Sequence, residues 1–171
     1  MPILPRLLTL SSKAWMVAYL GAILGVAAAW GPGNDRALVQ VVVIPAVYLA
    51  TDLVWTYLRD RKTYFPTAAL ASGLIGAAVL NPAGPLWTVV AFPLLAVASK
   101  QLLKLRKRHV FNPAAFGLVA LSVFDPSVNS WGASAWWPRP LVIGAFLVGL
   151  FMIHRVRRWE TFLSFLVVYA A

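Results

Sequence analysis

The sequence predicts an all-α, polytopic integral membrane protein with about seven transmembrane or half-membrane helices in one membrane domain, residues 1–171. Apolar residues make up 61% of the chain and charged residues 12%, and the mean hydropathy is +0.78. A soluble domain carries about a quarter charged residues. Lipid therefore has to cover much of this surface. The charged residues also gather in short segments between apolar runs, as in a chain that crosses a bilayer several times.

Each predicted helix is an apolar run that ends at a turn or at a charged segment. Gly31-Pro32-Gly33-Asn34 closes the first run, and Asn81-Pro82-Ala83-Gly84-Pro85 closes the third. Pro45 predicts a kink within the second run. In chain order, the runs are Ala14–Trp30, Ala37–Leu58, Thr67–Leu80, Leu86–Leu103, Ala114–Phe124, Leu141–Ile153 and Thr161–Ala171.

The basic residues give these runs an orientation. All of them except Arg36 and Arg139 lie in the amino-terminal tail or in every second loop. The positive-inside rule then predicts seven crossings with the amino terminus in the cytoplasm. The net charge of +10 is explained by this topology, so we expect a lipid bilayer and no nucleic acid as partner.

Two of the predicted helices are too short to cross a bilayer alone. Thr67–Leu80 would span about 21 Å and Ala114–Phe124 about 17 Å, against roughly 30 Å of hydrocarbon. Both are rich in Gly and Ala, and Gly73 and Ala77 are spaced for close helix contact. These helices either pack inside a multi-helix core or border a site for a substrate or cofactor.

The start of the fifth run carries a first group of candidate residues. Asn112 is a favoured helix cap and Pro113 a favoured first helical residue. With Arg108 and His109 just before it, this helix terminus could hold a phosphate or another anion. Plain helix capping explains Asn112 and Pro113 equally well.

Asp52 is the second candidate, because it lies inside the second apolar run. A carboxylate within a membrane is costly and is therefore a candidate for ion passage. Structural pairing or capping near the cytoplasmic boundary is the alternative, and Arg59 lies two turns along the same helix face.

Several kinds of active site are excluded by composition. The chain has no Cys and only two His, so thiolate metal sites and cysteine nucleophiles are absent and a histidine-ligated metal centre is not expected. No carboxylate pair or Ser/His/Asp set can be assembled from this chain, and four of its five acidic residues lie near predicted helix boundaries. We therefore expect no catalytic residue and no metal site.

Three ordered segments resemble the NqrB/RnfD family, the membrane subunits of sodium-pumping NADH:quinone oxidoreductase and of Rnf electron-transport complexes. The most specific segment runs from Ser99-Lys100-Gln101 through Arg108-His109-Val110-Phe111-Asn112-Pro113 to Gly117-Leu118. The others begin at Phe65-Pro66 and at Arg158-Trp159-Glu160. The resemblance covers about residues 52–171 and is strongest to short stand-alone RnfD-like members and to those found with enediyne biosynthesis genes.

The resemblance implies broken helices arranged in repeats, a bacterial inner (cytoplasmic) membrane location, and partner subunits of a membrane redox complex. It also implies flavin-dependent electron transfer coupled to ion movement. The family's S-G-A-T attachment motif is missing, so FMN or riboflavin would bind non-covalently, with Lys100, Arg108, His109, Phe111, Asn112 and Pro113 as candidate ligands. From the apolar end at Ala171 we expect either a chain truncated at its carboxyl terminus or a short last helix.

Three functions stay open at this point. The first is a membrane subunit of an electron-transport complex, which at most transfers electrons and is flavin- or quinone-associated or serves as a scaffold. The second is a transporter or channel for ions or small solutes on the same scaffold, without redox chemistry. The third is an accessory membrane protein of a biosynthetic gene cluster.

Overall fold

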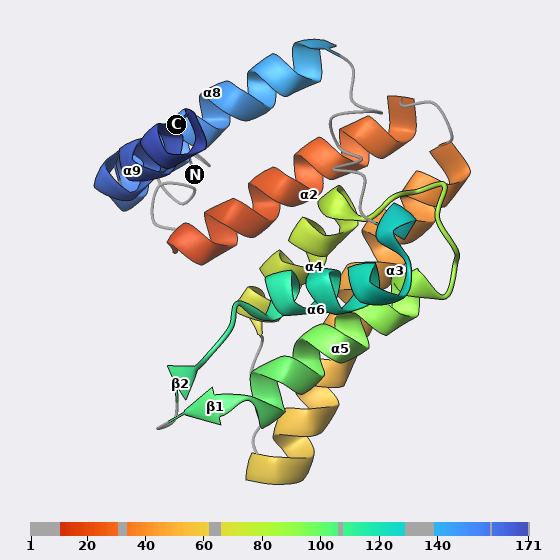
Figure 1. Cartoon of the computed structure of the whole chain (residues 1–171). Helices are drawn as coiled ribbons and strands as arrows, with labels where there is room; N and C mark the ends of the chain where they lie inside the picture. Colours follow the sequence, from red (N-terminus) through yellow and green to blue (C-terminus); the bar gives the residue numbers. More distant parts are fainter. Residues whose placement is uncertain are drawn as a thin grey trace, which may run out of the picture.

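A computed structural model describes residues 11–30, 34–61, 66–105, 108–128, 139–157 and 159–170, in which almost every element is a helix (Figure 1). The α-helices are α2 (Ser12–Trp30), α3 (Asn34–Asp60), α4 (Thr67–Val79), α5 (Thr88–Leu102), α6 (Pro113–Phe124), α8 (Arg139–Val156) and α9 (Trp159–Ala170). A short 3-10 helix, η1 (Pro126–Val128), follows α6. Each apolar run of the sequence has therefore become a helix, within a few residues of its expected ends.

The all-α class is confirmed, with one small addition that was not expected. β1 (Lys104–Leu105) and β2 (Arg108–His109) form a two-residue antiparallel ladder between α5 and α6. Lys104 pairs with His109, and Leu105 pairs with Arg108. The two residues between these strands in the sequence, Arg106 and Lys107, are not turn-forming types, so the sequence did not predict the ladder.

Two described helices are long and apolar enough to cross a membrane, over Lys13–Trp30 and Asp35–Asp60. α4, α5, α6 and the Val142–Arg155 part of α8 are apolar but shorter. Large apolar side chains are exposed along several helices, including Val42, Val123 and Val168. These surfaces fit lipid or partner subunits, whereas the number of crossings stays a prediction.

The short helix α4 lies at the centre of the bundle, where it contacts α2, α3, α5 and α6. Gly73 of α4 approaches α3 so closely that a Cβ atom there would lie 2.7 Å from the Pro45 Cα. α3 continues through Pro45 as one helix. The predicted close packing of the third run, with Gly73 at a helix contact, is thus confirmed, because small residues let two backbones meet.

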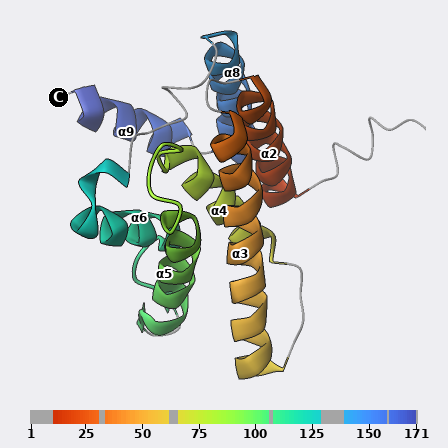
Figure 2. The ribbon, with the colours of Figure 1, turned by 90° about the vertical axis from the view of Figure 1, so that its right-hand side faces the viewer.

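The basic ends of neighbouring helices lie together. Arg59 near the end of α3 donates a 2.6 Å hydrogen bond to Gln101 Oε1 near the end of α5, and both ends lie at the bottom of the bundle in Figure 2. Arg155 near the end of α8 lies 5.8 Å from the ring centroid of Trp15, near the start of α2. This pairing agrees with the alternation of charge in the sequence.

Candidate functional site

A stripe of buried polar side chains runs along the inner face of α3. Its members lie at intervals of four or eight residues, a spacing that places them on one helix face: Gln40, Tyr48, Asp52 and Thr56. Near the start of the helix, Gln40 Nε2 donates to the Asn81 carbonyl at 3.1 Å. The stripe thus extends from the turn after α4 towards the basic end of α3.

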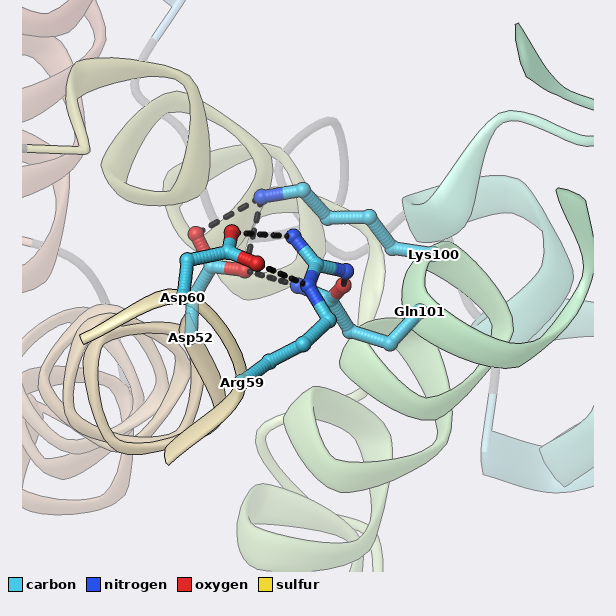
Figure 3. Close-up of polar contacts among 5 residues, drawn as sticks. All are labelled: Asp52, Arg59, Asp60, Lys100 and Gln101. Atoms are coloured by element: carbon cyan, nitrogen blue, oxygen red, sulfur yellow. Dashed lines mark hydrogen bonds and ion pairs between the residues drawn. The ribbon is translucent and has the colours of Figure 1, made fainter. Parts of the chain in front are cut away.

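Asp52 of this stripe forms an ion pair with Lys100 of α5 (Figure 3). The Lys100 Nζ atom of α5 lies 2.7 Å from Asp52 Oδ1 and 2.6 Å from Oδ2, and Gln101 Nε2 donates to Oδ1 at 3.2 Å. The Asp52 side chain is 0% exposed and the Lys100 side chain 17%. The Asp52 carboxylate is therefore fully buried in the bundle, whereas the Lys100 side chain is partly exposed to solvent.

A second pair continues this cluster towards the outside. Arg59 donates to both carboxylate oxygens of Asp60 at 2.8 and 2.7 Å, and to Gln101 as described above. Gln101 therefore links the buried pair to the exposed one, as Figure 3 shows. The result is a polar network between the ends of α3 and α5.

Asn112 caps α6 as its sequence position predicts. Its Oδ1 accepts from the backbone N–H groups of Ala114 and Ala115, at 3.0 and 3.4 Å, and its carbonyl accepts from Phe116 N–H at 2.9 Å. Pro113, at the first helical position, has no N–H to offer. Asn112 thus accepts from the first amides of α6 as a helix N-cap does, and anion binding at this helix terminus stays a prediction.

The remaining candidate residues before α6 are Phe111, Arg108 and His109. The exposed Phe111 ring lies 5.9 Å, centroid to centroid, from the Phe116 ring. Arg108 and His109 lie in β2, and their side chains are outside the described part of the structure. The described contacts around Phe111, Asn112 and Pro113 are those of a helix cap and an aromatic pair, and flavin binding at this turn stays a prediction.

The structure regroups the candidate residues. Lys100, predicted together with Asn112 as a cofactor ligand, pairs with Asp52. Structural pairing was one of the two predicted roles of Asp52. Neither Tyr48 nor Gln101 was predicted as a site residue from the sequence. Tyr48 lies one helical turn from Asp52 on the same face, a spacing visible in the sequence. Gln101 gave no such signal, because its role depends on how α5 packs against α3.

Replacing Asn112 with Ala is expected to lower the free energy of unfolding by about 1 kcal/mol, because two amides of α6 lose their acceptor. The measurement is thermal unfolding of the detergent-purified protein. Ser122→Ala serves as a control, since that hydroxyl donates to the Leu118 carbonyl within the same helix, at 2.9 Å. Equal effects of both changes would contradict the capping role.

Comparison with known proteins supports the resemblance. The chain is similar to the RnfD subunits of ion-translocating oxidoreductase complexes. It is 30% identical over 131 residues to the RnfD subunits of Escherichia coli O1:K1, of E. coli strain K12 / DH10B and of Shigella boydii serotype 18, an alignment that covers 71% of this chain and 36% of each relative. The chain thus spans about a third of the length of these relatives. No family model matches it, and no solved structure matches it.

Proposed function

We propose that this protein is a membrane-embedded subunit of an RnfD/NqrB-type electron-transport complex whose electron flow is coupled to ion movement. Its similarity to RnfD subunits carries this proposal. The apolar, exposed helix faces support a place in the bilayer, in the inner membrane of a bacterium with the basic loops on the cytoplasmic side. Other subunits of the complex would cover part of these faces.

The polar network supports a part in ion movement more than a redox role. Asp52 is a charged group held in the interior of an apolar bundle, the placement that marks ion and proton pathways in membrane proteins. By contrast, the chain contains no Cys for an iron–sulfur cluster. We therefore propose that electrons pass through companion subunits and that this chain supplies scaffold and ion-handling groups.

Non-covalent binding of a flavin is a separate part of the proposed function. FMN or riboflavin would have to be held non-covalently, because the S-G-A-T motif is missing from the sequence. The amides at the start of α6 are engaged by Asn112, so a phosphate would have to be held by other groups.

The test is purification of the tagged full-length protein from the membranes of its own host. We expect it to require detergent for extraction and to co-purify with subunits that carry flavin or iron–sulfur centres, identified by mass spectrometry and absorbance. The complex should lose reduced-donor oxidation in membranes of a strain that lacks the chain, and regain it on complementation. A chain that purifies alone and colourless, from a strain whose membrane electron transport is unaffected by its loss, would rule the proposal out.

A further inference from the structure

A second buried polar group lies beside the Asp52–Lys100 pair. The Tyr48 side chain is buried, and its hydroxyl makes no hydrogen bond within the described part of the chain. Tyr48 lies one turn from Asp52 on α3, and the Ser72 side chain of α4 is the polar group beside its hydroxyl. A buried hydroxyl left without a partner costs about 1–3 kcal/mol, so an additional polar ligand at this point would satisfy it.

The two charges of the pair differ in their access to water. Asp52 is 0% exposed and is fixed on a short side chain in the middle of α3, so it cannot leave the interior. Lys100 is partly exposed and has four flexible methylene groups, so its ammonium can withdraw to the water edge next to the Arg59 and Asp60 side chains. The carboxylate is therefore the permanent part of the site, and the ammonium is the part that can be replaced.

We infer that Asp52 and Tyr48 form a binding site for one small monovalent cation, and that the Lys100 ammonium occupies this site as an internal, displaceable substitute. The inference rests on the proposed function, of which it names the ion-handling site.

The available ligands fit a single hard charge. Two carboxylate oxygens of Asp52 and the phenolic oxygen of Tyr48 are oxygen donors, which hard cations prefer. No group of three or more acidic or His side chains lies together among the described residues, so a divalent ion would keep an uncompensated charge in the interior. One carboxylate balances one monovalent cation.

The exchange conserves charge and protons. A hydrated cation gives up water and binds the Asp52 carboxylate, while the Lys100 ammonium leaves the carboxylate for water and keeps its three protons. No bond is formed or broken other than these ionic and hydrogen-bonding contacts. The interior of the bundle stays neutral before and after the step, which avoids the cost of an unpaired buried charge.

The experiment uses Lys100→Met in the full-length protein, purified in detergent at mildly alkaline pH. Thermal unfolding is compared in sodium chloride and in choline chloride at equal ionic strength. We expect the variant to be destabilised in choline and to recover most of its lost thermal stability in sodium, which fills the vacated place. The wild-type protein should respond less, because its own ammonium competes with the cation.

Two further variants separate the site from a general salt effect. Lys100→Met combined with Asp52→Asn should show no difference between the two salts. Lys100→Met combined with Tyr48→Phe should need about tenfold more sodium for the same recovery, which corresponds to one lost ligand of ordinary strength. Equal stability of Lys100→Met in both salts would overturn the inference. Since no redox partner takes part, failure here leaves the proposed place in an electron-transport complex intact.

Discussion

Replacing Lys100 with Met is expected to lower the free energy of unfolding by about 3–5 kcal/mol when sodium is absent. The change removes the Lys100 ammonium from the 0% exposed Asp52 carboxylate, and removing one partner from a buried pair has this typical cost. Gln101 Nε2 remains as a donor at 3.2 Å but is neutral. Chemical or thermal unfolding in detergent, in sodium-free buffer, measures the effect.

Asp52→Asn should cost less than Lys100→Met. The lysine left behind can move its ammonium to water, whereas the aspartate left behind cannot move. The double variant, which has no buried charge, should be more stable than Lys100→Met alone, so the double-mutant cycle should be strongly non-additive. Arg59→Met is the matched control, because its pair with Asp60 is about half exposed and should contribute less than about 1 kcal/mol. Additive effects at Asp52 and Lys100 would contradict a coupled pair.

The sequence was sufficient to locate the helices, for identifiable physical reasons. In an apolar run the backbone N–H and C=O groups must hydrogen-bond to one another, which a helix achieves. Each of the seven apolar runs is therefore predicted to be a helix, and the structure confirms all seven. Small residues in the third run predicted close packing, and Gly73 lies against Pro45 as expected. Local rules also sufficed at Asn112, whose capping contacts involve only residues two to four positions away.

The site was less predictable, because its central contact joins distant parts of the chain. Asp52 and Lys100 are 48 positions apart, and periodicity alone does not say which faces of α3 and α5 meet. The sequence placed them in two different candidate sites, one for ion passage and one for a cofactor. The β1–β2 ladder was also missed, since a run of Lys and Arg between two helices has no strand pattern.

Replacing Gly76 with Ala is expected to destabilise the bundle by about 1–3 kcal/mol, the usual range for overpacking a filled core. A Cβ atom at this position in α4 would lie 2.0 Å from Cε1 and 2.3 Å from Cζ of Phe92. The Phe92 ring of α5 is fully buried and also borders Gly117 of α6, 3.1 Å from the position of a Cβ atom there. The ring therefore has no open side to which it can shift without moving a helix.

Gly21→Ala in α2 serves as the control, because it is expected to stabilise the protein, whereas Gly76→Ala should destabilise it. A Cβ atom there would have no other atom within 4 Å, so only the higher helix propensity of Ala acts, which favours the folded state by up to about 1 kcal/mol. Adding Phe92→Leu to Gly76→Ala should restore part of the lost stability, because the smaller side chain leaves room for the methyl group. Equal responses at Gly76 and Gly21 would show that the Phe92 ring is not confined between α4 and α6. Confinement of this ring matters for the site as well, because Tyr48 lies 6.3 Å from it, centroid to centroid, and α5 carries both Phe92 and Lys100.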